Sequence, residues 1–265
     1  MICVAILIAV GLGSLLAPWI ARYPYDAIDL TLGATAPSMA HWFGTDMLGR
    51  DLFSRTLHGG QISLAVGFVG TLVSLCVGIA YGAMAGYSGG RVDELMMRFV
   101  DLLYSLPYLF LVIILLVFFS NSILMLFVAL GLVQWLTMAR IVRGQVLSLR
   151  NAEFVQAARL FGTRTRGIIS RHLLPNMMGP IVVFGTLTVP TVILQEAFLS
   201  FLGLGVQPPR ASWGTLISDG AGAMSLFPWL VFFPATILAM VLFSLNYLGD
   251  GLREVIDPRL RRKTE

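Results

Sequence analysis

The chain has 265 residues, of which 57% are apolar and only 12% are charged, and its mean hydropathy is +0.84. Soluble domains carry about a quarter charged residues, so this composition excludes an ordinary soluble protein and predicts an integral membrane chain. The formal net charge of +4 does not indicate a nucleic-acid partner, because the basic residues gather in short segments between apolar stretches.

Apolar stretches of about 20 residues, enough to cross roughly 30 Å of hydrocarbon, recur along the chain. They predict six membrane-spanning helices, at 2–20, 62–86, 99–119, 123–140, 176–202 and 227–249. The first stretch has the length of a secretory signal, but it lacks a preceding positive segment and a convincing cleavage site, so a retained helix is favoured. We therefore predict an all-α integral membrane protein in two parts. These are a first transmembrane helix with an external loop (1–61) and a core of five helices (62–265).

The distribution of basic residues predicts the topology, because Lys and Arg near the ends of spans are retained in the cytoplasm. Segment 140–171 carries seven basic residues and one acid, and the tail 253–265 carries five basic and three acidic residues. Segments 22–61 and 203–224 show no such excess. The prediction is a multi-pass membrane protein with both termini in the cytoplasm.

A basic loop, 144–175, joins the fourth and fifth predicted spans. Residues 153–161 have helical spacing, and Gly162 is expected to end this helix because glycine adopts a positive φ without a steric penalty. The residues expected to share one face are Phe154, Ala157, Ala158 and Phe161. Thr163 is expected to cap a second short helix, which should end before Pro175. Such a bend suits docking of a soluble partner, and the alternative is a loop that lies on anionic membrane lipid through its arginines.

This loop resembles the cytoplasmic coupling loop of permeases from ATP-binding-cassette importers. The matching positions are Gln156, Ala157, Ala158, Gly162, His172, Leu174 and Pro175. Gln156 stands where the family has glutamate and His172 where it has an aliphatic residue, although the run 171–176 looks like that of the peptide-permease branch. The resemblance implies that these residues couple the pore to ATPase subunits, with Gln156 and His172 as supporting members.

Two further stretches extend the resemblance over nearly the whole chain. Residues 43–55 look like the signature ahead of the second span in C-type subunits of dipeptide, oligopeptide and nickel permeases, and 196–214 look like a second signature of the same subunits. Runs 138–145 and 249–253 resemble the oligopeptide branch in particular. The resemblance implies a type I importer permease fold, one half of a pore, and a place in the bacterial cytoplasmic (inner) membrane. The implied partners are a homologous B-type permease, two ATPase subunits and an extracytoplasmic substrate-binding protein.

The chain contains no glycine-rich phosphate loop ending in Lys-Ser or Lys-Thr, and Lys263 is its only lysine. We therefore predict no catalytic residue, metal site or cofactor in this chain, while the resemblance implies ATP and Mg²⁺ on the partner subunits. The predicted function is a permease subunit of an ATP-driven importer of oligopeptides or dipeptides. Nickel or glutathione import is the alternative within the family, and a gradient-driven secondary carrier is the alternative from another class.

Further candidate residues lie near the predicted outer face. Glu196 is close to the outer end of the fifth span, and ionisable residues in membranes are often functional, so we predict that it faces the pore or binds a peptide amine. Four charged residues of the external loop either pair with one another or receive the binding protein: Asp46, Arg50, Asp51 and Arg55. Three tryptophans are expected to anchor the chain at the outer interface: Trp42, Trp213 and Trp229.

Overall fold

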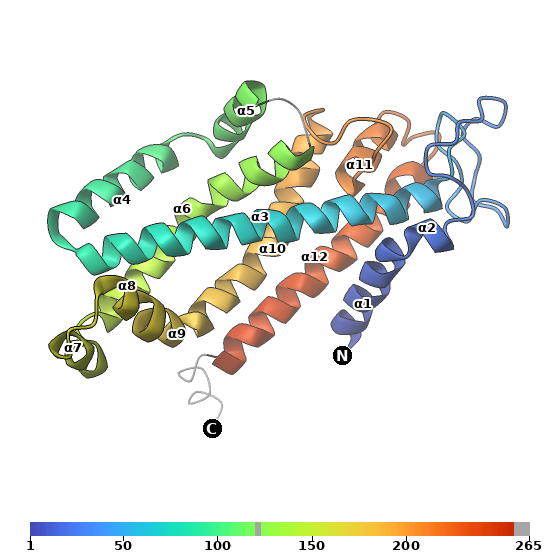
Figure 1. The fold of residues 1–265 in the computed structure, drawn as a ribbon. Coiled ribbons are helices and arrows are strands. Elements are labelled where there is room, and N and C mark those ends of the chain that lie inside the picture. Colours follow the sequence, from blue (N-terminus) through green and yellow to red (C-terminus); the bar gives the residue numbers. More distant parts are fainter. Residues whose placement is uncertain (120–122, 257–265) are drawn as a thin grey trace. The chain divides into compact units, whose positions relative to one another are not determined.

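The computed structural model describes residues 1–119 and 123–256, and its regular elements in these ranges are all helices (Figure 1). The predicted all-α fold is thereby confirmed. The helices are α1 (Ile2–Leu15), α2 (Ala17–Ile20), α3 (Leu52–Ser88), α4 (Gly90–Ser105), α5 (Tyr108–Phe119), α6 (Ile123–Leu149), α7 (Glu153–Leu160), α8 (Thr165–Gly167), α9 (Leu174–Asn176), α10 (Met178–Phe201), α11 (Trp213–Ala221) and α12 (Trp229–Ile256), with a π-helix at Ile168–Leu173. Residues 257–265 of the predicted core, which hold most of the basic tail, lie outside the described residues.

Four described helices are long and apolar enough to cross a membrane: α3, α6, α10 and α12. The bent pair α4 and α5 makes five if it counts as one span, and α1 is apolar but short. The first predicted span, 2–20, divides at Leu16, because Pro18 lies in the first turn of a new helix, α2. Helices α3 and α6 extend beyond the predicted 62–86 and 123–140.

The third predicted span, 99–119, is not one straight helix. It is formed by the end of α4 and by α5, which meet at an angle of 91°. Pro107 has no backbone N–H, and its ring disfavours helical backbone at Leu106, whose ψ of 136° is extended. Pro107 thus divides the run predicted as one span into two helices, and this proline is visible in the sequence.

The chain divides into two compact units, each with its own apolar interior. The first holds mainly Met1–Phe68 and Val189–Leu248, and its core includes Trp213 and Ile193. The second holds mainly residues 69–119 and 127–188, where α3 and α6 pack together. An added Cβ at Gly82 would overlap the carbonyl oxygen of Ala139, so glycine permits this close approach of the two helices.

Candidate functional site

The segment between α6 and α10 presents a short amphipathic helix, α7. Val155 and Ala158 are buried on its inner face, in a cluster that also holds Val142 and Ile168. Its other apolar side chains are exposed: Phe154, Ala157, Leu160 and Phe161. The predicted shared face is therefore correct for Phe154, Ala157 and Phe161 but wrong for Ala158, which lies one turn from Val155 on the packed side. The exposed fractions of Leu160 and Phe161, 88% and 89%, leave an apolar surface without cover in this chain.

Gly162 ends α7 through two characteristic hydrogen bonds. The N–H of Gly162 donates to the carbonyl of Arg159 at 3.0 Å, and the N–H of Thr163 donates to the carbonyl of Ala158 at 3.0 Å. With a φ of +74° at Gly162, this is the Schellman motif, which turns the chain sharply at a helix end. No atom lies within 4 Å of a Cβ added at Gly162, so the need for glycine is conformational.

Replacement of Gly162 by alanine is expected to loosen the end of α7 by about 1 kcal/mol, because an L-residue is disfavoured in the left-handed region. Amide hydrogen exchange at Thr163 should accelerate about fivefold, the equilibrium change that this energy produces. Gly162→Asn is the matched control, since asparagine tolerates this conformation, and it should change exchange less. Equal exchange in wild type and Gly162→Ala would contradict the assignment of the motif.

The return path to α10 differs from the predicted one. Thr163 does not cap the next helix: α8 begins after Arg164, which makes no side-chain capping bond. Helical backbone does not end before Pro175 either, since Leu174 keeps helical angles of −56° and −48°. The π-helix at Ile168–Leu173 ends two residues before Pro175, and its wider turn gives room to the proline ring and changes the hydrogen-bond pattern where proline lacks an N–H.

The other predicted coupling residues lie around this bend. The side chain of Gln156 donates to the carbonyl of Asn151 at 2.9 Å, and the carbonyl of His172 accepts from the side chain of Asn176 at 2.6 Å. Leu174 packs against the same cluster as Ala158, whereas Ala157, Gly162 and Pro175 are exposed. The structure thus brings Ala158 and Leu174 together and leaves the roles of all seven residues in coupling as predictions.

Two arginines connect this region to the end of α3 within the second unit. The guanidinium of Arg159 lies over the ring of Tyr87, 5.1 Å from its centre. Nη1 of Arg150 donates to the carbonyl of Gly86 at 3.2 Å. A cation–π contact therefore holds α7 to α3, and a charge-assisted hydrogen bond holds the end of α6 to the same long helix.

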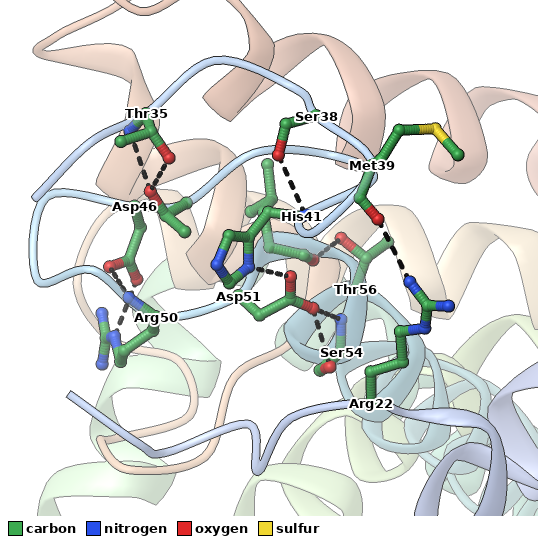
Figure 2. A network of polar contacts seen from close by, with 12 residues as sticks. Arg22, Thr35, Ser38, Met39, His41, Asp46, Arg50, Asp51, Ser54 and Thr56 are labelled. Carbon is green, nitrogen blue, oxygen red and sulfur yellow. Dashed lines mark hydrogen bonds and ion pairs between the residues drawn. The ribbon is translucent and has the colours of Figure 1, made fainter. Parts of the chain in front are cut away.

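In the first unit, the loop before α3 is built on buried ionic contacts (Figure 2). Asp46 accepts four hydrogen bonds, from the backbone of Leu48 and Arg50 and from the side chains of Arg50 and Arg55. Both side-chain bonds are 2.7 Å long. Arg55 is only 3% exposed, and its Nη2 lies 3.6 Å from Asp219. Partial burial raises the pKa of Asp219, and the Arg50 cation opposes this shift.

Asp51 fixes the start of α3. Its carboxylate accepts from the backbone N–H of Ser54 at 2.8 Å and from the Ser54 hydroxyl at 2.7 Å, as an N-cap does. Its other oxygen lies 2.9 Å from Nδ1 of His41 (Figure 2). The four charged residues predicted in this loop therefore face one another or the helix end. This geometry supports the predicted alternative of internal pairing, and their role in docking stays a prediction.

Glu196 is enclosed within the first unit. Its side chain has no exposed surface, and it accepts from the hydroxyls of Ser200 at 2.6 Å and Ser63 at 3.3 Å. Ser63 in turn accepts from the N–H of Trp213, and Ser200 contacts Ser212 at 3.3 Å. The carboxyl thus joins α3, α10 and the start of α11. Its predicted pore-facing role stays a prediction and would require a conformational change to expose the carboxyl.

Removal of the Glu196 carboxyl is expected to destabilise the chain. Glu196→Ala leaves a cavity and deprives two buried hydroxyls of their acceptor, so we expect a loss of about 2–4 kcal/mol in thermal or denaturant unfolding of the purified protein. Glu196→Gln keeps the volume and a carbonyl acceptor, and it should lose less than about 1 kcal/mol. If Glu196→Gln is stable but transports poorly, a role in the pore is supported; if Glu196→Ala is as stable as wild type, the enclosed network is not structural.

Sequence reasoning missed the partners of these residues. Trp213 was expected at the membrane interface, but it is fully buried, and its indole N–H donates to the carbonyl of Thr56 at 3.0 Å. Ser63 and Asp219 received no prediction, although each contacts a predicted residue. Their contacts join positions far apart in the sequence, for which spacing gives no signal.

Comparisons with known proteins place the chain in a family of transport proteins. Residues 78–262 match the family described as "Binding-protein-dependent transport system inner membrane component". The chain is 50% identical to the oligopeptide transport system permease protein OppC of Escherichia coli K12, over 97% of this chain and 85% of that protein. It is 50% identical to OppC of Haemophilus influenzae, over 92% and 79% of the two chains. The dipeptide transport system permease protein DppC of Bacillus subtilis is 48% identical, over 94% and 78%.

Among solved structures, a chain of the MetNI methionine ABC transporter in an inward-facing conformation is similar, with a TM-score of 0.61 and 18% identity. The similarity covers 77% of this chain and 96% of that chain. At this identity the likeness concerns the fold alone, and that fold is the type I importer permease fold that the sequence resemblance implied. The family match and the 50% identity to OppC proteins confirm the resemblance predicted from the sequence.

Proposed function

Because this chain belongs to the family of inner-membrane components of binding-protein-dependent transport systems, we propose that it is a permease subunit of an ATP-driven importer of oligopeptides or dipeptides. The observation that carries the proposal is the exposed apolar face of α7, which ends in a Schellman motif. It occurs in a chain that is 50% identical to an oligopeptide permease protein. The chain forms half of a transmembrane pore and binds no ATP itself. Cargo specificity rests largely with a separate binding protein.

The proposed complex contains four kinds of subunit. A homologous B-type permease completes the pore, two ATPase subunits bind ATP and Mg²⁺ on the cytoplasmic side, and an extracytoplasmic binding protein delivers the peptide. The excess of arginines in 140–171 supports a cytoplasmic position of α7, with both termini on the same side. Segments 22–61 and 203–224 lie on the opposite side.

The proposed mechanism passes motion through α7. The ATPases bind Phe154, Ala157 and Phe161 on its exposed face and move it when they close on nucleotide. The Gly162 bend, the packed Ala158 and Leu174, and the turn at Pro175 transmit the movement as a rigid body, with Gln156 and His172 in support. ATP binding shifts the equilibrium between inward-open and outward-open states, because the closed ATPases make contacts with α7 in one state that they lack in the other.

Co-purification tests this proposal. A tagged chain from its native membrane should bring a second permease and ATPase subunits, and the eluate should hydrolyse ATP. The same eluate from a Gly162→Val variant should retain the second permease while ATPase activity falls or loses its response to peptide, because a β-branched residue fits the left-handed conformation poorly. A chain that purifies alone, from membranes in which it supports uptake, would contradict the proposal.

A further inference from the structure

Two adjoining hollows lie in the first unit, between the loop before α3, the loop after α10 and helix α11. The larger has a volume of about 580 Å³ and is mainly apolar, with Leu48 and Leu216 in its walls. The smaller has a volume of about 140 Å³ and is mainly polar, with Arg55 and Arg210 in its walls. Asp219 lines both. Ligand sites for small molecules typically occupy about 300–1,000 Å³ and combine apolar walls with a few polar groups, as this pair does.

The smaller hollow contains a buried donor that has no partner. Arg55 is 3% exposed; its Nη1 and Nη2 face Asp46 and Asp219, whereas its Nε has no hydrogen-bond partner among the described residues. A buried N–H left unpaired costs about 1–3 kcal/mol, so an acceptor that reached this atom would stabilise the site. The hydroxyls of Ser200 and Ser218 donate to Glu196 and to the carbonyl of Phe201, and neither bonds Nε of Arg55.

Charge in the smaller hollow favours an anion. Arg210 is exposed at its edge and has no ion-pair partner within residues 1–119 and 123–256. Arg50 and Arg55 are matched by Asp46 and Asp219, so Arg210 supplies the unmatched positive charge. Arginine binds carboxylates through paired N–H groups, and the space accommodates a carboxylate and the carbon atoms next to it.

We infer that the smaller hollow binds the C-terminal carboxylate of a short peptide while the larger hollow receives its apolar side chains. This inference rests on the proposed function and adds a peptide-binding site on the permease itself. A peptide brings a carboxylate, apolar groups and an ammonium group, and the walls of the larger hollow include the acids Asp26 and Asp219. A single acidic side chain from a docking protein would fill only the smaller hollow and would contact neither the apolar walls of the larger hollow nor Asp26.

The test compares the tripeptide Leu-Leu-Leu with its C-terminal amide. Binding of each is measured by calorimetry to the full chain with its co-purified partners, without binding protein and without ATP. Wild type should bind the free acid about tenfold more tightly than the amide, as one charge-assisted pair predicts. Arg210→Gln should weaken binding of the acid to the level of the amide and leave the amide unchanged, and Arg210→Lys should retain part of the difference.

A control variant keeps the outcome interpretable. Arg22→Gln changes an exposed arginine of the same loop region that donates to the carbonyl of Met39 and lines neither hollow, and it should bind both peptides as wild type does. Arg55 is left intact because its ion pairs hold the loop. Equal affinity of wild type for acid and amide, or equal loss of both in Arg210→Gln, would overturn the inference. So would an Arg210→Gln variant that binds peptide normally but loses affinity for the binding protein.

The same preparations separate this inference from the proposed function. Uptake of Leu-Leu-Leu is measured in proteoliposomes with binding protein and ATP. If wild type shows ATP-driven uptake but does not prefer the free acid in the binding assay, the inferred peptide site is overturned and the proposed function stands. An absence of ATP-driven uptake by wild type would contradict the proposed function, independently of the results with the Arg210 variants.

Discussion

Replacement of Asp46 by alanine is expected to lower the free energy of unfolding of the purified chain by about 3 kcal/mol, because it leaves the buried cation of Arg55 without its main partner. Asp46 accepts from the side chains of Arg50 and Arg55 at 2.7 Å each and from two backbone N–H groups, so it holds both the turn and Arg55. The 3.6 Å contact of Arg55 with Asp219 compensates only in part.

Two variants accompany this measurement. Asp46→Asn keeps a neutral acceptor of the same shape and should lose roughly half as much as alanine, because hydrogen bonds to a charged group are about twice as strong. Asp26→Ala removes an exposed acid from the same loop and should stay within about 0.5 kcal/mol of wild type. Unfolding of Asp46→Ala at the wild-type denaturant concentration would mean that Arg55 finds other compensation, and that the loop is not held by this network.

Replacement of Phe161 by serine is expected to reduce peptide uptake at least tenfold without unfolding the chain. Phe161 is 89% exposed, so its loss removes little internal packing. If the ATPase covers this ring, serine forfeits about 1.5–3 kcal/mol of apolar burial at that contact, enough to weaken ATPase binding tenfold or more. ATPase recovered with the tagged chain and uptake in proteoliposomes should fall together.

Matched variants separate docking from general effects. Phe161→Leu keeps most of the apolar area and should retain most of the uptake. Met39→Ser removes an exposed apolar side chain from the loop before α3, away from α7 in the sequence, and should leave ATPase recovery unchanged. Normal uptake by Phe161→Ser would show that the exposed face of α7 does not carry the contact with the motor.

Much of the fold could be predicted because a run of apolar residues is a local signal for a membrane-spanning helix. The apolar runs at 62–86, 176–202 and 227–249 became long helices, since backbone groups in hydrocarbon must bond within their own segment. The bend at Pro107 was missed although proline marks it, because the apolar run continues across it. The early start of α3 at Leu52 was missed because its first turns are polar, while Asp51 and Ser54 form the cap that specifies it.

The candidate site was predictable only where its signals are local. Gly162 lies at a helix end that short-range spacing predicts. Asp46 and Arg50 are four residues apart, so pairing between them was one of the two expected outcomes for the loop before α3. Contacts of Glu196 with Ser63 and of Arg55 with Asp219 join residues more than 100 positions apart, and no spacing rule anticipates them. The hollows beside Asp219 follow from those contacts and were likewise invisible in the sequence.

The central claim is that ATP, through partner subunits, drives peptide across the membrane with this chain as half of the pore. The most direct test reconstitutes the co-purified complex in sealed proteoliposomes and follows uptake of labelled tri-leucine with its binding protein present. We predict uptake that requires ATP on the α7 side, persists when ionophores collapse ion gradients, and stops in the Phe161→Ser variant. Uptake that continues without ATP and ends when the gradients collapse would contradict the account and identify a gradient-driven carrier.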